Sequence, residues 1–209
     1  MKIVICGAGA IGSWLSTYLS VDTRGTHEIT ILDRDLVEER NIIAGTQNYF
    51  REQIGIPKVE ALQFNIHKQF QREIKTVYQE IGYGKWPQEN DNGEPLEPNI
   101  TIDCLDNYIS RKAIQGNWAY SSPIFPKTKN PYELLHIGFS DQFTFAIEWA
   151  ENYEAPEDNP KARDICELPG ASSFVNMVAA IGSSVVQEYL TTGKKREFCG
   201  NRFSIREVK

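Results

Sequence analysis

The sequence predicts an α/β fold with a doubly wound, mostly parallel sheet and antiparallel strands added near the C-terminus. Short apolar runs alternate with segments in which apolar residues recur at helical spacing, a pattern typical of strand–helix–strand units with parallel strands. Near the C-terminus two apolar runs follow each other with no helical segment between them, which favours antiparallel pairing. The 209 residues suit a single domain over 1–209.

The first part of the chain predicts three strands and two helices. Residues 2–6 indicate a buried strand, residues 10–20 have a helical pattern, and residues 27–32 indicate a second strand. Pro57 suits the first turn of a second helix, and a third strand is expected within residues 73–80. The apolar positions of the second helix are Val59, Leu62, Ile66 and Phe70.

The middle of the chain predicts an insertion followed by a strand and a helix. Residues 82–98 are rich in glycine, proline and acidic residues, so we expect an exposed insertion. Residues 99–107 indicate a strand that runs into a polar loop, and a helix then extends to about residue 119. Two further strands are expected at 134–140 and 142–149.

The last part of the chain predicts a loop, a long helix and a hairpin. Residues 151–164 are polar and contain prolines, which is typical of a mobile loop. The long helix ends at Gly193, and the tail favours a hairpin about Gly200–Asn201. The apolar face of this helix consists of Phe174, Val178, Ile181, Val185 and Tyr189.

Composition excludes some classes of function. The formal net charge of −6 leaves no surplus of basic residues to neutralise a nucleic-acid backbone, so we expect no nucleic-acid partner. No apolar run approaches the roughly 20 residues needed to cross a bilayer, and the first residues do not resemble a signal peptide. We therefore expect a cytoplasmic protein without a membrane partner.

Cysteines and histidines give little sign of a metal site. The four cysteines form no C-x-x-C pair, so we expect free thiols and no zinc. Cys6 and Cys104 end apolar runs and favour buried thiols in strands. Three histidines stand far apart, and each is more readily interpreted as a surface or core residue than as a ligand: His27, His67 and His136.

A glycine motif follows the first predicted strand. Gly7, Gly9 and Gly12 have the spacing G-x-G-x-x-G between a strand and a helix, which predicts a nucleotide-binding loop in a Rossmann-like sheet. Gly7 permits the tight turn, Gly9 lets phosphate approach the backbone, and Gly12 allows close helix packing. Asp33 ends the second strand and suits an acceptor for ribose hydroxyls. A structural turn without a ligand is the alternative.

Three further stretches distinguish this sequence from a dinucleotide dehydrogenase. Residues 31–41, "ILDRDLVEERN", end at Asn41; residues 55–62, "GIPKVEAL", place Lys58 at a helix start; and residues 103–107, "DCLDN", contain Asp106. With the glycine loop, this ordered set resembles the ThiF/MoeB/HesA family, whose adenylyltransferase fold is shared with ubiquitin-activating enzymes. The resemblance is good over 1–62 and 99–112 and extends to an arginine four residues after Asn107.

This resemblance implies a function for each motif. It implies that Asp33 holds the ribose of ATP, that Asn41 and Lys58 contact the phosphates, that Asp106 binds Mg²⁺, and that Asn107 belongs to the nucleotide site. Lysine and Mg²⁺ suit the attack of a carboxylate on a phosphate because they offset negative charge. The structural alternatives are a solvated lysine in a first helical turn and a helix cap formed by the Asp-Asn pair.

The sequence departs from the family at one position that matters for activity. The family usually has an Arg-Gln pair after the asparagine, whereas Thr46–Gln47 stand at that place here. Arg40, Arg51 or an arginine of a partner subunit are the candidates to supply the missing guanidinium. Arg111 occupies the family's position after the Asp-Asn pair.

Some family members pass the activated carboxyl group to a cysteine. Cys166 follows the predicted mobile loop and precedes the last helix, where a nearby helix N-terminus would lower the pKa of its thiol. Cys166 is therefore the candidate transfer thiol, with an incidental cysteine as the alternative. Cys199, in the terminal hairpin, is a weaker candidate.

The resemblance implies an ATP- and Mg²⁺-dependent adenylyltransferase that activates the C-terminal carboxylate of a small ubiquitin-like or sulfur-carrier protein, acting as a homodimer or heterodimer. One alternative is a non-catalytic nucleotide-binding or scaffold subunit, which the missing Arg-Gln pair favours. Another is an NAD-dependent dehydrogenase, which would use Gly7, Gly9, Gly12 and Asp33 but leave Asn41, Lys58 and Asp106 without a shared purpose.

Overall fold

The computed structural model describes residues 1–23, 25–82, 87, 89–94, 96–119, 132–165 and 168–208. The strands are β1 (Lys2–Cys6), β2 (Glu28–Asp33), β3 (Lys75–Tyr78), β4 (Ile100–Asp103), β5 (Glu133–Phe139), β6 (Thr144–Trp149), β7 (Glu197–Asn201) and β8 (Ser204–Val208). The helices are α1 (Ala10–Asp22), α2 (Glu39–Ile43), η1 (Arg51–Gln53), α3 (Lys58–Phe70), α4 (Tyr108–Ala119) and α5 (Ala171–Thr192).

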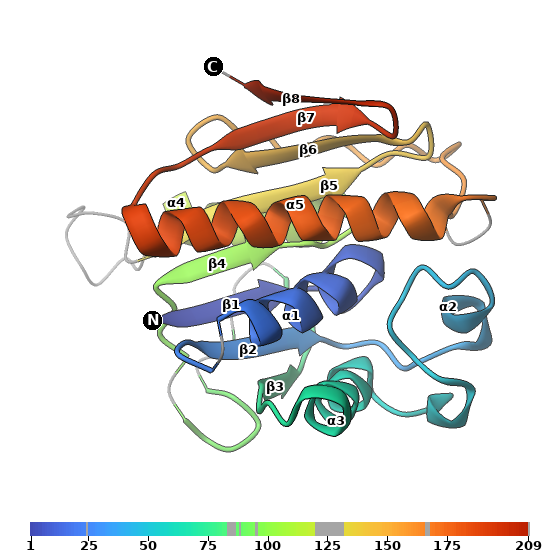
Figure 1. Cartoon of the computed structure of the whole chain (residues 1–209), viewed down its shortest axis with the longest axis vertical. Coiled ribbons are helices and arrows are strands. Elements are labelled where there is room, and N and C mark those ends of the chain that lie inside the picture. The colour runs from blue at the N-terminus through green and yellow to red at the C-terminus, as the bar shows by residue number, and fades with distance from the viewer. Residues whose placement is uncertain are drawn as a thin grey trace.

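The strands form one sheet in the order β3-β2-β1-β4-β5-β6-β7-β8, shown in Figure 1. β1 pairs in parallel with β2 and β4, and the parallel part continues to β3 on one side and β5 on the other. β6, β7 and β8 are then added in antiparallel pairing. The predicted mostly parallel sheet with antiparallel strands near the C-terminus is therefore confirmed.

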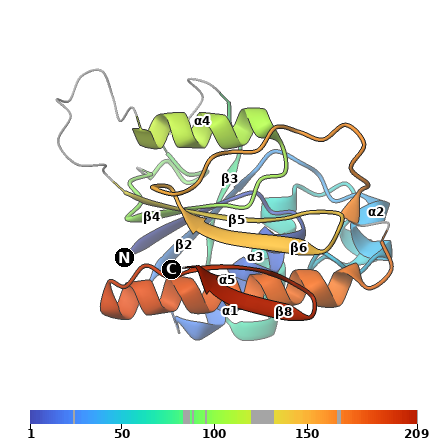
Figure 2. The same cartoon turned by 90° about the horizontal axis from the view of Figure 1, so that it is seen from above.

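Helices cover both faces of the sheet. Figure 2 shows α4 on one face and α1 and α5 on the other. Because side chains alternate along a strand, β1 serves both layers: Ile3 and Ile5 belong to the core on the α1 and α5 side, whereas Val4 and Cys6 belong to the core on the α4 side. The carboxyl ends of the parallel strands point toward α2 (Figure 1).

Two short elements, α2 and η1, lie between β2 and α3 and are not predicted by the sequence. They contain five and three residues, too few to produce a helical period. α2 begins with a reciprocal cap in which the backbone N–H of Glu38 donates to Asn41 Oδ1 at 2.8 Å and the N–H of Asn41 donates to the Glu38 carbonyl oxygen at 3.0 Å. This cap fixes Asn41 at the start of the segment.

The terminal hairpin turns two residues later than the predicted Gly200–Asn201. Asn201 pairs with Ser204 across the hairpin, so the turn consists of Arg202 and Phe203. The Asn201 side-chain oxygen accepts the N–H groups of Phe203 and Ser204 at 2.9 and 3.1 Å, and this local bonding fixes the turn. Gly200 remains in β7, where a Cβ would lie 2.2 Å from the Ser204 carbonyl oxygen.

The two predicted surface segments differ in their burial. Residues 82–98 are described only in part: Asp91–Glu94 are exposed, but Asn90 is buried and Leu96 packs against the core on the α4 side. Residues 151–164 have no regular structure and are mostly exposed, with Tyr153 buried.

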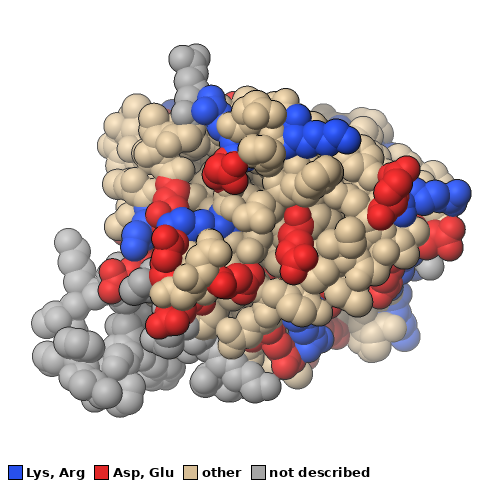
Figure 3. Space-filling view, turned by 90° about the horizontal axis from the view of Figure 1, so that it is seen from below, with Lys and Arg blue, Asp and Glu red and all other residues tan. Residues whose placement is uncertain are grey.

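In the described part of the chain, no helix has both the length and the apolarity to span a bilayer. On the face toward the α3 and β3 edge, acidic and basic side chains are interspersed (Figure 3).

Candidate functional site

The three glycines of the loop between β1 and α1 have different surroundings. Gly7 has a φ of +99°, and an added Cβ would lie 2.9 Å from the Cys104 carbonyl oxygen. At Gly12 an added Cβ would lie 1.8 Å from the Gly7 carbonyl oxygen. Any larger residue at this position would therefore push the first turn of α1 away from the loop. Nothing lies within 4 Å of a Cβ at Gly9. The protein itself requires glycine at positions 7 and 12, whereas Gly9 leaves open space beside the start of α1.

The N-terminus of α1 is suited to hold an anion. The helix has 13 residues and no acidic residue in its first turn. The first N–H groups of a helix have no acceptor within the helix, and the helix dipole places partial positive charge there. The open space at Gly9 lies at this end, so a phosphate can approach the backbone without a steric barrier from the protein.

Asp33 ties the glycine loop to the end of β2. Its carboxylate accepts the N–H of Ala8 at 2.6 Å through Oδ2 and the N–H of Asp35 at 2.7 Å through Oδ1. Burial raises the pKa of the Asp33 carboxyl, and the opposing effects of the Lys58 ammonium and the two N–H groups only partly offset this. Carboxylate oxygens accept more than one hydrogen bond, so Asp33 can also accept a ribose hydroxyl.

Lys58 is buried at the first turn of α3. Its backbone N–H donates to the Asp35 carbonyl oxygen at 2.9 Å, and its Nζ lies 3.2 Å from Asp35 Oδ2. The lysine side chain is 9% exposed, so the alternative of a solvated lysine does not describe this residue. Asn41 is also buried, and its oxygen accepts the Glu38 N–H while the residue lines the same cleft as Lys58.

The segment after β4 carries the Asp-Asn pair. Asn107 caps α4, because its Oδ1 accepts the N–H of Ser110 at 2.8 Å. Asp106 is exposed toward the cleft. Arg111 folds back so that its Nε donates to the Leu105 carbonyl oxygen at 2.8 Å. The helix-cap alternative therefore describes Asn107, and Asp106 is an exposed residue of the cleft lining.

One cleft of about 880 Å³ brings these residues together beyond the carboxyl ends of the parallel strands. This is the location at which doubly wound sheets bind their ligands. Gln47 also lines the cleft. Gly12 supports the loop from behind and is not part of the lining. Besides Gln47, the residues singled out in the sequence that line the cleft are Gly7, Gly9, Asp33, Arg40, Asn41, Lys58, Cys104, Asp106, Asn107 and Arg111.

Residues 153–165, here called the strap, form an outer wall of the cleft that the sequence does not reveal. The strap follows β6 and reaches the carboxyl ends of the strands before α5 (Figure 2). Asp158 Oδ1 accepts the N–H of Tyr108 at 2.8 Å, and the N–H of Arg163 donates to Asp141 Oδ2 at 3.2 Å. The sequence indicates only a polar loop here, because wall residues in an irregular segment leave no periodic pattern.

His136 is a core residue that anchors the start of the strap. Its Nδ1 lies 3.0 Å from Asp103 Oδ2, and both side chains are buried. The His136 and Tyr153 rings stack with centroids 3.8 Å apart and an angle of 11° between their planes. Gln115 also holds this point, because its Nε2 donates to the Tyr153 carbonyl oxygen at 2.8 Å. Of the two interpretations given for His136, a surface residue or a core residue, the structure supports the core residue.

Several other candidates lie outside the cleft or outside the described residues. Cys166 is not among the described residues. Burial raises the pKa of the Cys6 thiol well above its ordinary value, which suits a structural thiol. Cys199 is half-buried in β7, where its sulfur accepts Arg206 Nε at 3.2 Å. Arg51 pairs with Glu39 and does not line the cleft, whereas Arg40 does.

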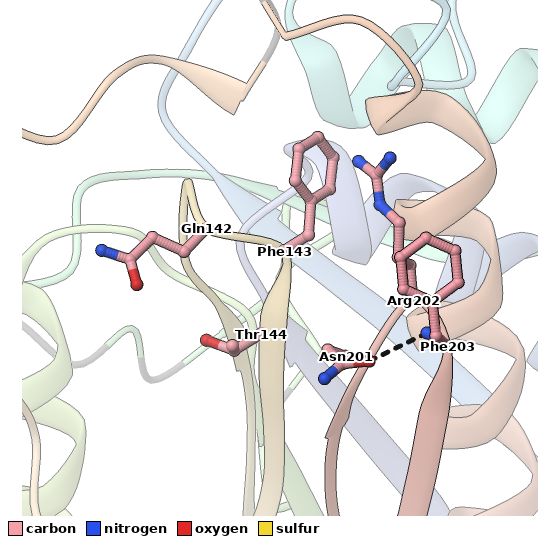
Figure 4. Close-up of a pocket in the computed structure, with 6 residues that line it drawn as sticks. All are labelled: Gln142, Phe143, Thr144, Asn201, Arg202 and Phe203. Atoms are coloured by element: carbon pink, nitrogen blue, oxygen red, sulfur yellow. Dashed lines mark hydrogen bonds between the residues drawn. The ribbon is translucent and has the colours of Figure 1, made fainter.

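A second, shallower cavity of about 360 Å³ lies between the β5–β6 and β7–β8 turns. Figure 4 shows the Arg202 guanidinium beside the Phe143 ring, and the guanidinium carbon lies 3.5 Å from the ring centroid. This cavity contains no carboxylate and none of the sequence motifs. The large cleft is therefore the candidate functional site.

Among the described residues, no group of three or more His, Cys, Asp or Glu side chains is placed to hold a metal ion. Mg²⁺ does not need such a group, because it is commonly held by one or two carboxylates together with substrate phosphates. Asp106, exposed toward the cleft, fits that mode of binding.

The sheet order, the glycine loop and the cleft beyond the strands define a Rossmann-like α/β protein. The sequence matches the ThiF family over residues 1–208, and the chain belongs to this family. No curated protein matches the sequence.

Several solved structures share the fold of this chain. E. coli MccB solved with ATP has a TM-score of 0.67 and 15% identity, with 100% of this chain and 62% of that chain covered. MccB in complex with N-formylated MccA has a TM-score of 0.70 and 17% identity, with coverages of 99% and 63%. Selenomethionine PaaA has a TM-score of 0.61 and 14% identity, with coverages of 100% and 63%. This chain thus spans less than two thirds of these chains.

Proposed function

We propose that this protein is an adenylyltransferase that uses ATP and Mg²⁺ to activate the C-terminal carboxylate of a small ubiquitin-like or sulfur-carrier protein or of a peptide. The observation that carries the proposal is that four motifs separated in sequence line one cleft, with Gly9, Asp33, Lys58 and Asp106 as their representatives. Family membership supports it. Two structures of MccB, a protein of similar fold, also support it: one was solved with ATP and the other in complex with N-formylated MccA.

The geometry suits the binding of a nucleotide. The N–H groups at the start of α1 and the open space at Gly9 would receive phosphate, while Asp33 at the end of β2 would accept a ribose hydroxyl. Lys58 is held at the cleft by Asp35 and would direct its ammonium to the phosphates. Asp106 would hold Mg²⁺ beside them, and the charge of that ion would offset the charge of the leaving pyrophosphate.

The reaction needs positioning and charge more than proton transfer. A carboxylate oxygen of the substrate attacks the α-phosphorus, a P–O bond forms, and the bond to the β-phosphate breaks as pyrophosphate leaves. The substrate is already ionised at neutral pH, so no general base is required. The residues expected to act are therefore cations and hydrogen-bond donors, namely Lys58 and Asn41.

A non-catalytic nucleotide-binding or scaffold subunit of a heterodimeric complex is the second candidate function. It is favoured by Thr46 and Gln47 at the place of the family's Arg-Gln pair, because Thr46 is fully buried and neither residue carries a charge. A scaffold would bind nucleotide without forming an adenylate. The two candidates thus differ in catalysis and not in nucleotide binding.

Calorimetric titration distinguishes nucleotide binding from its alternatives. We would titrate wild type, Asp106→Ala and Glu60→Ala with ATP, each with and without Mg²⁺, and wild type with NAD. Glu60 is an exposed carboxylate on α3 that does not line the cleft, so it controls for the loss of one negative charge. We expect Mg²⁺ to strengthen ATP binding in wild type and Glu60→Ala but not in Asp106→Ala.

Exchange of pyrophosphate into ATP then tests catalysis. The probe is a peptide that ends in Gly-Gly with a free carboxylate, and the same peptide with an amidated C-terminus is the control. Exchange with the free acid alone supports the adenylyltransferase. ATP binding without exchange supports the scaffold, and binding of NAD but not ATP contradicts both.

A further inference from the structure

The cleft contains cations with and without carboxylate partners. Lys58 pairs with Asp35, and Arg34 pairs with Glu80. Arg40 pairs with Glu38 and Asp164. Arg111 and Arg163 have no carboxylate partner in the described part of the chain. The cationic residues that line the cleft are Arg34, Arg40, Lys58, Arg111 and Arg163.

Arg111 and Arg163 differ in what already engages their guanidinium groups. Arg111 donates through Nε to the Leu105 carbonyl oxygen. Among the described residues, no hydrogen bond or ion pair engages the guanidinium of Arg163, which is exposed on the strap. Arg163 is therefore the cleft cation whose full set of guanidinium donors is available to an anionic ligand.

The backbone around Arg163 is fixed although its side chain is not. Its N–H donates to Asp141 Oδ2 at 3.2 Å, which ties the strap to the turn between β5 and β6. The next residue, Asp164, lies 3.5 Å from Arg40 Nη1 on α2. Just before it, the Ala162 N–H donates to the Asn159 carbonyl oxygen at 2.9 Å and closes a turn. These contacts hold the backbone of Arg163 in the wall of the cleft.

We propose that Arg163 binds the phosphates of the nucleotide and supplies in cis the guanidinium that this chain lacks at Thr46–Gln47. The proposal rests on the proposed function, because it needs a nucleotide in the cleft. The N-terminus of α1 would contact the phosphates from the sheet side, and Arg163 would contact them from the strap. A guanidinium suits this task because its planar donors can bond two phosphate oxygens at once.

The chain offers a matched control for this residue. Lys161 lies two positions earlier on the strap, carries the same charge and is also exposed, but it does not line the cleft. Arg163→Gln and Lys161→Gln therefore change the net charge equally, and only the first removes a cation from the cleft lining. Because both residues are exposed, neither change disturbs the core.

The experiment compares ATP with adenosine. ATP affinity is measured by calorimetry in the presence of Mg²⁺, and adenosine affinity by competition with ATP, for wild type, Arg163→Gln and Lys161→Gln. We expect Arg163→Gln to weaken ATP binding about tenfold or more, as for the loss of one charge-assisted contact. Its affinity for adenosine and both affinities of Lys161→Gln should match wild type.

Each other outcome contradicts the proposal in a distinct way. Unchanged ATP affinity in Arg163→Gln would show that the guanidinium does not contact phosphate. Equal losses for ATP and adenosine would assign Arg163 to the shape of the strap, and an equal loss in Lys161→Gln would indicate a general effect of charge. If wild type binds ATP in none of these titrations, the proposed function fails together with this inference.

Discussion

Lys58 and Asp35 are joined by two contacts that connect α3 to the segment after β2. The backbone N–H of Lys58 donates to the Asp35 carbonyl oxygen at 2.9 Å, and the Lys58 ammonium lies 3.2 Å from Asp35 Oδ2. The lysine side chain is 9% exposed, but the aspartate side chain is 56% exposed. The buried ammonium has this carboxylate as its ion-pair partner, whereas the carboxylate can be hydrated by water.

This asymmetry predicts unequal effects of the two single substitutions. Asp35→Ala should lower the free energy of unfolding by about 1–3 kcal/mol, because it leaves a buried ammonium without its partner. Lys58→Met should cost less, since the new side chain is apolar and the remaining carboxylate is exposed. Urea denaturation followed by circular dichroism measures both values. A larger loss of unfolding free energy in Lys58→Met than in Asp35→Ala would show that burial of the lysine does not decide the energetics of this pair.

Gly9 and Gly12 predict opposite consequences for the same substitution. Gly12→Ala should destabilise the fold by about 3 kcal/mol or more, because the new Cβ would lie 1.8 Å from a backbone oxygen. Gly9→Ala should leave the unfolding transition unchanged, because nothing lies within 4 Å of its Cβ. It should nevertheless weaken ATP binding about tenfold or more, since the methyl group fills the space open to phosphate.

Thermal unfolding and ATP titration of the two variants check this prediction. Gly116→Ala, on α4, is the control for adding a methyl group at a site with no neighbour within 4 Å. ATP affinity in Gly9→Ala equal to that of wild type would place the nucleotide away from this loop.

Asp33 predicts a pH dependence of stability. Burial raises the pKa of its carboxyl in the folded protein, so the folded state keeps a proton that the unfolded chain has already released. Stability from this residue is therefore present below the ordinary aspartate pKa of about 3.9 and is lost as the pH rises to the folded value. Wild type should lose stability relative to Asp33→Asn over this window.

Urea denaturation of wild type and Asp33→Asn at several pH values above about 4 tests the sign. The exposed Glu60→Gln variant controls for the loss of a carboxylate. An advantage of wild type that grows with pH would mean that Lys58 and the N–H groups of Ala8 and Asp35 outweigh burial and hold the folded pKa below its usual value.

The sequence predicted those parts of the molecule in which apolar residues follow a regular pattern. β1 was predicted because a short continuous apolar run suits a strand buried on both faces, and α3 because apolar residues recur in it at helical spacing. Gly7, Asp33, Lys58 and Asp106 could be placed on one cleft because the carboxyl ends of parallel strands share one edge of the sheet.

The remainder depends on contacts that no local pattern contains. α2 is fixed by the Asn41 cap and has only five residues. The pairing of His136 with Asp103 joins residues on two strands, and the Arg163 N–H donates to Asp141 on the turn between β5 and β6. A polar segment such as the strap reads in the sequence as a loop, because its position is decided by these single bonds.

The contact between Tyr153 and His136 predicts how firmly the strap is held. The rings are 3.8 Å apart, and the Tyr153 hydroxyl has no hydrogen-bond partner among the described residues although it is buried. Tyr153→Phe keeps the stacked ring and removes only an unsatisfied polar group, so the strap should stay in place. Tyr153→Leu removes the ring contact, which is worth about 0.5–1.5 kcal/mol and should increase opening of the strap about two- to tenfold.

Limited trypsin digestion reads out this opening, because Lys161 and Arg163 are exposed cleavage sites within the strap. Mass spectrometry of the fragments should show faster cleavage after these two residues in Tyr153→Leu than in wild type or Tyr153→Phe. The rate of cleavage after Lys68, on α3, should be the same in all three proteins and serves as the internal control. If Tyr153→Phe is cleaved as fast as Tyr153→Leu, the hydroxyl and not the ring holds the strap, and the stacking on His136 has no anchoring role.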